Sequence, residues 1–361
     1  MSRFVEFAAA AAVVLVGGNA ASAASYLYVE DNNSLISAFE IAKNGSLKEI
    51  SGSPFNSNTN SPSDFAIAVD GNGPYLYTTG GDSDNVAIFS IGTDGSLTSV
   101  SDTTAAGQSA GATVLAKSDK RLYLVNTVDG GAIAAFDVEK SGAKLKPIAG
   151  SPFPVSCPGF CTSNPSEVLI SGSYLYSIDS YGWYVSSFSV AKNGALTELD
   201  SYATDYGPLD GIITPKGNYI YVTDAAHGDI SGYSAAAGVL TQLSGSPFPA
   251  GNQPNGIVMT PNDKFVYVAN YGDGTISGYS IGSGGVLEAL AGSPFADGSG
   301  TAPIAVAIDK AGKHLFVTNA NTQDIAVYDI AESGSITQID GSPFPLTDGT
   351  GPKGLALYEP K

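Results

Sequence analysis

Short apolar strands separated by polar turns recur along this chain at a nearly constant interval. An aromatic residue sits inside an alternating apolar segment seven times, at Tyr28, Tyr77, Tyr123, Tyr176, Tyr221, Tyr267 and Phe316. Alternation with a period of two predicts β-strands, and the intervals between these aromatics run from 45 to 53 residues. An interval of this length is typical of one four-stranded blade of a β-propeller.

Each repeat supplies the other three strands in a fixed order. An apolar stretch such as 65–69 precedes the aromatic strand, and an alternating stretch such as 86–91 follows it. A turn containing glycine, as at Thr93-Asp94-Gly95, then leads to an outer strand, because a tight hairpin favours a residue that tolerates positive φ. In five repeats the outer strand ends in Gly-Ser-Pro-Phe, where proline suits a strand leaving the sheet.

The two ends of the repeat region are complementary. The region begins directly with an aromatic strand at Tyr26 and ends with 354–358, which resembles an innermost strand without a blade of its own. We therefore expect an all-β, seven-bladed propeller over residues 24–361, closed by the C-terminal strand joining the N-terminal blade. Closure of this kind joins the two ends by hydrogen bonds instead of leaving two exposed sheet edges.

Residues 1–23 have the pattern of a secretory signal peptide. Arg3 precedes an apolar run at 8–16, and small residues follow, with Ala21 and Ala23 in the positions that precede cleavage. The apolar run is too short for a membrane span, which needs roughly 20 residues. A secreted or periplasmic protein is expected.

Composition and charge narrow the set of partners. The formal net charge is −18, and Arg121 is the one arginine after the leader. Nucleic-acid binding needs clustered Lys and Arg, so nucleic acid is not an expected partner. The same deficit argues against tight binding of phosphorylated ligands.

The two cysteines, Cys157 and Cys161, are separated by three residues. In an exported chain a disulfide across this loop is the leading interpretation, with reduced thiols or a redox pair as alternatives. A zinc site is not expected because no His or further Cys lies nearby.

Three repeats, Tyr221-Val-Thr-Asp224, Tyr267-Val-Ala-Asn270 and Phe316-Val-Thr-Asn319, together with the Gly-Ser-Pro-Phe ends, resemble the seven-bladed lactonase-like propellers. That family includes propeller-type 6-phosphogluconolactonases and carboxymuconate cyclases and borders on the YVTN-repeat propellers. The resemblance implies an anionic lactone bound by His and Arg side chains. Here Arg121 and His314 are expected on the opposite face, which leaves His227 as the candidate general base.

Three acids share one register at the start of innermost strands: Asp64, Glu167 and Asp210. Their position places them near the central channel. They are candidate catalytic groups acting as acid and base on a neutral lactone, or candidate ligands of Ca²⁺ or Mg²⁺. Capping of backbone amides is the structural alternative.

Further candidates occupy the loops on the same face. Residues just past the second strands form a candidate binding set: Asp31, Asn126, Asp179, Asp224, Asn270 and Asn319. Turn capping is again the alternative. Trp183 and Tyr184 are candidate contacts for a sugar or a partner protein, with plain packing as the alternative.

Two functions follow from these patterns. The first is a secreted, non-catalytic module that binds a small molecule, glycan or protein at the acidic channel mouth. The alternative is a lactone-ring hydrolase, resembling 6-phosphogluconolactonase, or a related cyclase. A monomer is expected in both cases, with no required cofactor and Ca²⁺ or Mg²⁺ as optional ions.

Overall fold

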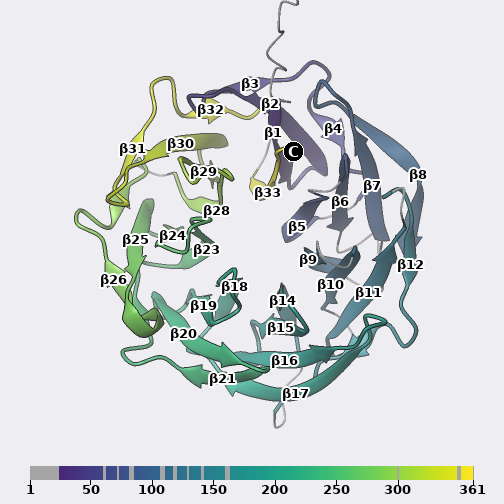
Figure 1. The fold of residues 1–361 in the computed structure, drawn as a ribbon. Coiled ribbons are helices and arrows are strands. Elements are labelled where there is room, and N and C mark those ends of the chain that lie inside the picture. The colour runs from purple at the N-terminus through teal and green to yellow at the C-terminus, as the bar shows by residue number, and fades with distance from the viewer. Residues whose placement is uncertain are drawn as a thin grey trace, which may run out of the picture.

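The chain forms a ring of seven antiparallel β-sheets around a central channel (Figure 1). The computed structural model describes residues 24–59, 62–70, 73–80, 85–105, 110–116, 120–127, 130–139, 142–158, 163–298, 301–347 and 351–360. The expected signal peptide and Cys161 lie outside these residues. The predicted seven-bladed propeller is confirmed.

Each blade contains four strands that run outward from the channel. The innermost strands, from blade 1 to blade 7, are β33 (Pro352–Tyr358), β5 (Pro62–Asp70), β9 (Ala110–Ala116), β14 (Pro165–Ser171), β18 (Pro208–Ile213), β23 (Pro254–Met259) and β28 (Pro303–Ile308). The second strands are β1 (Ser25–Asp31), β6 (Tyr75–Gly80), β10 (Arg121–Asn126), β15 (Tyr174–Asp179), β19 (Tyr219–Asp224), β24 (Phe265–Asn270) and β29 (His314–Asn319).

The outer half of each blade completes the sheet. The third strands are β2 (Leu35–Ile41), β7 (Asn85–Ile91), β11 (Ala132–Val138), β16 (Tyr184–Val190), β20 (Asp229–Ala236), β25 (Thr275–Ile281) and β30 (Asp324–Ile330). The fourth strands are β3 (Leu47–Glu49), β8 (Leu97–Ala105), β12 (Leu145–Pro147), β17 (Leu196–Ala203), β21 (Val239–Gln242), β26 (Leu287–Ala289) and β31 (Ile336–Gln338). One short 3-10 turn, Ser283–Gly285, is the helical element of the described chain.

The Gly-Ser-Pro-Phe ends return to the third strand as short extra strands. These are β4 (Phe55–Asn56), β13 (Phe153–Pro154), β22 (Phe248–Pro249), β27 (Phe295–Ala296) and β32 (Phe344–Pro345). The serine explains part of the motif, because its hydroxyl accepts a hydrogen bond from a third-strand amide. Ser293 Oγ, for example, lies 2.9 Å from Gly278 N. The motif therefore pairs with the first residues of the third strand, which the short fourth strand does not reach.

The ring closes as predicted. Strand β33 pairs antiparallel with β1, and Tyr358, Leu357 and Ala356 lie opposite Tyr26, Leu27 and Tyr28. The C-terminal strand thus supplies the innermost position of blade 1 (Figure 1). Blade 1 is therefore assembled from both ends of the described chain.

The recurrent tyrosine joins one blade to the next at five places in the described residues. The hydroxyl of Tyr267 donates to the carbonyl oxygen of Gly334 in the following blade at 2.7 Å, and Tyr28, Tyr77, Tyr123 and Tyr221 make the equivalent bond. The glycine of this turn has φ near +84°, and an added Cβ would lie 2.6 Å from the ring of Phe265. The turn glycines are thus needed for the close approach of the preceding blade as well as for the hairpin.

Tyr267→Phe is expected to lower the free energy of unfolding by about 1–3 kcal/mol, because the buried Gly334 carbonyl loses its partner. Chemical denaturation measures the change. Tyr181→Phe is the matched control, since that ring is 72% exposed and its loss of a hydroxyl is expected to change stability by less than about 0.5 kcal/mol. Equal stabilities for both variants would contradict a role for the inter-blade bond.

Candidate functional site

Glu167 on β14 and Asp210 on β18 lie together in the central channel. Both line a pocket of about 230 Å³ with Thr113 and Ala305, and their exposed fractions are 7% and 8%. Two of the three register-matched acids are thus brought into one place, as the sequence predicted. The side chain of Asp64 lies outside the described residues, so the expected Ca²⁺ or Mg²⁺ site stays a prediction.

Backbone amides fix both carboxyl groups. Glu167 Oε1 accepts a hydrogen bond from Val168 N at 2.8 Å. Asp210 Oδ1 accepts from Gly211 N at 2.7 Å, and its Oδ2 accepts from Ile257 N of the next blade at 2.9 Å. The bonds hold the pair in a set orientation and leave the second Glu167 oxygen for other contacts.

Burial changes the proton affinity of the pair. It raises the pKa of Asp210 to about 7, against the opposing effect of the two backbone amides. Burial, and then the charge of Asp210, raises the pKa of Glu167 well above its ordinary range. Two such close carboxyls lose their protons in steps that belong to the pair, so a singly protonated pair is expected near neutral pH.

The shifts predict how stability depends on pH. Because the folded pKa values lie above those of the unfolded chain, the folded protein binds more protons, and this contribution is lost as pH rises from about 4 through 7. Glu167→Gln should reduce the fall in unfolding free energy between pH 5 and pH 8, by on the order of 2 kcal/mol. Denaturant titrations at both pH values measure it.

The exposed Glu332 provides the control for that comparison. Glu332→Gln should leave the pH dependence of stability as it is in the unsubstituted protein. A Glu167→Gln variant with an unchanged slope would show that the Glu167 carboxyl titrates as it does in the unfolded chain.

A second pocket, of about 310 Å³, lies at the mouth of the channel. Its polar lining comprises Thr127, Asn164, Ser166, Ser180, Asn255 and Lys353. Ser166 and Leu209 line this pocket, and the residues that follow them, Glu167 and Asp210, line the channel pocket. The mouth pocket therefore adjoins the carboxyl pair along β14 and β18.

Lys353 was missed by the sequence analysis. It stands in Pro352-Lys353-Gly354, the position that Ser166 occupies in Pro165-Ser166-Glu167. Successive side chains of a strand point to opposite sides, so the residue before each register-matched acid faces a different space from the acid itself. The same alignment that found the acids could have found this cation at the mouth.

The residues that end the second strands are buried beneath the loops. Asp31, Asn126, Asp179, Asp224, Asn270 and Asn319 have exposed fractions of 4% or less. Asp179 accepts hydrogen bonds from Ser163, Asn164, Tyr181, Gly182 and Tyr184. These contacts favour the turn-capping alternative at Asp179, and the next residue along, Ser180, lines the mouth instead.

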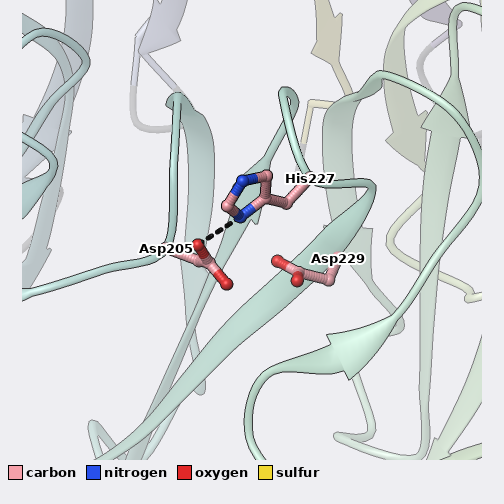
Figure 2. Close-up of side chains that lie close together, drawn as sticks. All are labelled: Asp205, His227 and Asp229. Carbon is pink, nitrogen blue, oxygen red and sulfur yellow. Dashed lines mark hydrogen bonds and ion pairs between the residues drawn. The ribbon is translucent and has the colours of Figure 1, made fainter.

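The remaining candidates lie on the outer part of the same face. His227 is hydrogen-bonded to Asp205, with Nδ1 and Oδ1 2.5 Å apart (Figure 2). Trp183 is 41% exposed and its ring centroid lies 4.0 Å from that of Tyr206. Tyr184 is buried, and its hydroxyl donates to Asp179 at 3.1 Å, which is a packing arrangement.

The opposite face holds the other histidine. His314 Nδ1 lies 2.6 Å from Asp309 Oδ2, and this contact raises the pKa of His314. Its ring lies against Gly45, in the turn between the last two strands of blade 1. The histidine therefore contributes to the contact between blades 7 and 1, on the face where the sequence placed it.

One known protein family matches part of this chain. Residues 185–348, a little under half of the chain, match the family described as "Lactonase, 7-bladed beta-propeller". The resemblance to the lactonase-like propellers is confirmed. No curated protein matches the chain.

Solved structures match the whole propeller. A putative 6-phosphogluconolactonase from Bacteroides uniformis superposes with a TM-score of 0.79 at 17% identity, over 93% of this chain and 99% of that one. A periplasmic gluconolactonase from Pseudomonas aeruginosa gives 0.75 at 17% identity, over the same shares. At such identities the likeness shows the fold.

The described residues form no helix with the length and apolar character that a membrane crossing requires. The disulfide expected between Cys157 and Cys161 stays a prediction, because Cys161 is outside those residues.

Proposed function

We propose that this protein hydrolyses a lactone ring at the channel mouth. The observation that carries the proposal is the buried pair Glu167–Asp210, whose burial places the pKa of Asp210 at about 7, beside a polar pocket that contains a lysine. The match to the lactonase family supports the hydrolase hypothesis better than the non-catalytic one.

The pair has the two protonation states that ring opening needs. In its singly protonated form one carboxylate accepts a proton from the attacking water, whose oxygen bonds to the lactone carbonyl carbon. The bond from that carbon to the ring oxygen breaks, and the other carboxyl group delivers its proton to the leaving oxygen. Water is consumed and one hydroxy acid is formed.

The mouth pocket supplies binding. We propose that Lys353, which lines this pocket, attracts the polar carbonyl group of a lactone toward the channel. The amide side chains of Asn164 and Asn255 suit the hydroxyl groups of a sugar ring. A pocket of about 310 Å³ suits a single sugar-sized ring.

The substrate is proposed to be an unphosphorylated sugar lactone. Solved relatives in fold include proteins named as a gluconolactonase and as putative 6-phosphogluconolactonases, which points to six-membered sugar lactones. The net charge of −18 disfavours a phosphate group at the mouth, and Lys353 is a single cation there rather than an arginine fork.

Partner binding is the second candidate function. The observation in its favour is the exposure of Tyr181, Trp183 and Tyr206, which are 72%, 41% and 44% exposed, and of which Trp183 and Tyr206 are in ring contact. Exposed rings of this kind stack on sugar faces or anchor a partner protein. This surface lies on the channel-mouth face, so it is compatible with a lactone site.

The extracytoplasmic location is retained as part of the proposal. It rests on the signal-peptide pattern of residues 1–23. A monomer that needs no cofactor for hydrolysis is proposed with it.

A pH-stat assay of the purified protein tests the function. The substrates are glucono-1,5-lactone, its 6-phosphate and an acyl-homoserine lactone, each compared with its spontaneous rate, with and without chelator. The proposal predicts acceleration of the unphosphorylated sugar lactone that persists with chelator. Faster turnover of the phosphorylated lactone would contradict the assigned substrate, and no acceleration of any lactone would contradict the function.

A further inference from the structure

Three side chains lie close together, two of them in blade 5 and one in the connection from blade 4 to blade 5 (Figure 2). Asp205 lies between β17 and β18, His227 lies in the loop between β19 and β20, and Asp229 begins β20. One ligand atom from each lies within 4.8 Å of the others. The side chains of His227 and Asp205 are 56% and 33% exposed, so the cluster is open to solvent.

A fourth carboxylate lies opposite Asp229 on the neighbouring strand. Asp224, at the end of β19, is fully buried and pairs with Asp229 across the two strands. Its Oδ2 accepts a hydrogen bond from Ser231 N at 2.9 Å, whereas its Oδ1 is buried with no hydrogen-bond partner. Asp229 Oδ1 is also buried without a partner. Two carboxylate oxygens therefore lack a donor at the same place.

The corresponding positions in other blades do have donors. In blade 7, Asn319 occupies the Asp224 position, and its Nδ2 donates to Asp324 Oδ1 at 2.8 Å. In blade 4, Asp179 is surrounded by amide and hydroxyl donors. Blade 5 instead places carboxylate against carboxylate. An unpaired buried charge is costly, so either a shared proton or a bound cation must neutralise these two carboxylates.

We propose that Asp205, His227 and Asp229, with Asp224 opposite Asp229, bind one divalent transition-metal cation such as Mn²⁺ or Zn²⁺. Carboxylates together with one imidazole suit these ions better than Ca²⁺ or Mg²⁺, which favour all-oxygen sites. The site is separate from the proposed lactone pocket and does not depend on lactone hydrolysis.

The short contact between His227 and Asp205 fits this assignment. The hydrogen bond between Nδ1 and Oδ1, 2.5 Å long, already holds the imidazole and the carboxylate side by side. A cation bound between them takes the place of this hydrogen bond, and the neutral imidazole then carries its proton on Nε2. The bound ion ties the connection between blades 4 and 5 to the β19–β20 hairpin.

Titration of chelator-treated, dialysed full-length protein tests the proposal. Mn²⁺, Zn²⁺, Ca²⁺ and Mg²⁺ are added separately, and binding is followed by calorimetry and thermal unfolding. One saturable site per chain is expected for Mn²⁺ or Zn²⁺, with Tm raised by roughly 3 °C or more at a concentration 100 times Kd. His227→Ala and Asp229→Asn are each expected to weaken binding at least tenfold.

Asp224→Asn is the most informative variant, because it recreates the Asn319–Asp324 pair of blade 7 within blade 5. It is expected to fold, to have a Tm without metal at least equal to that of the unsubstituted protein, and to lose at least tenfold in affinity. Asp340→Asn, at an exposed position, should bind the ion as the unsubstituted protein does.

Three results would overturn the proposal. They are the absence of saturable binding of Mn²⁺ and Zn²⁺, binding that is unchanged in a folded Asp224→Asn or Asp229→Asn variant, and an equal loss of affinity in Asp340→Asn.

Discussion

Glu167→Gln and Asp210→Asn combined are expected to lower kcat/KM for lactone hydrolysis by about 10²–10⁴-fold, the usual contribution of a positioned acid and base. The amides keep the shape of the channel pocket but neither accept a proton from water nor return one to the ring oxygen. Each single variant is expected to lose nearly as much as the double, because the two groups act as a unit. Initial rates in a pH-stat measure the effect.

Substitution of the exposed Glu332 by Gln provides the matched control, and its kcat/KM is expected to equal that of the unsubstituted protein. The double variant should remain folded, since both replacements remove carboxyl groups that burial already disfavours in their charged form. Full activity in a folded double variant would contradict the assignment of the pair.

Removal of residues 352–361 is expected to abolish the cooperative native state, a loss comparable to the whole stability of a typical domain, about 5–15 kcal/mol. The deletion takes away β33, exposes the edge of β1 and leaves blade 1 without its innermost strand. Circular dichroism with thermal unfolding measures the outcome, and aggregation through the exposed edge is expected to accompany it.

A circular permutant distinguishes the effect of losing the pairing between β33 and β1 from the effect of disturbing the C-terminus of the chain. Tyr358 lies opposite Tyr26, so a short turn from the end of β33 into β1 gives blade 1 the same chain order as every other blade. Placing residues 351–360 before Ala24 should therefore restore cooperative unfolding. A stable truncated protein, or a permutant as disrupted as the truncation, would contradict the closure argument.

The fold could be predicted from the sequence because every blade repeats the same pattern of residues. Alternating apolar residues, a turn glycine and a recurrent aromatic residue mark the same places seven times, so an exception in one repeat does not obscure the pattern. The second role of the glycines could not be derived in this way. It depends on the ring of the preceding blade, as Phe265 beside Gly334 shows.

The candidate site was predicted in part. Register alone placed Glu167 and Asp210 near the channel, and their proximity follows from adjacent blades converging on one axis. Their raised pKa values depend on how deeply the channel buries them, which register does not give. The different numbers of hydrogen-bond donors around Asp179 and Asp224 could not be predicted from the sequence either. The donors around each carboxylate come from separate loops.

The central claim is that the Glu167–Asp210 pair performs acid–base catalysis on a lactone. The most direct measurement is the dependence of kcat/KM on pH between 5 and 9 for glucono-1,5-lactone, corrected for spontaneous hydrolysis. The account predicts a bell-shaped profile that titrates near pH 7 on at least one limb and is lost in the residual activity of Glu167→Gln. A profile that is flat across this range, or identical in the variant, would contradict it.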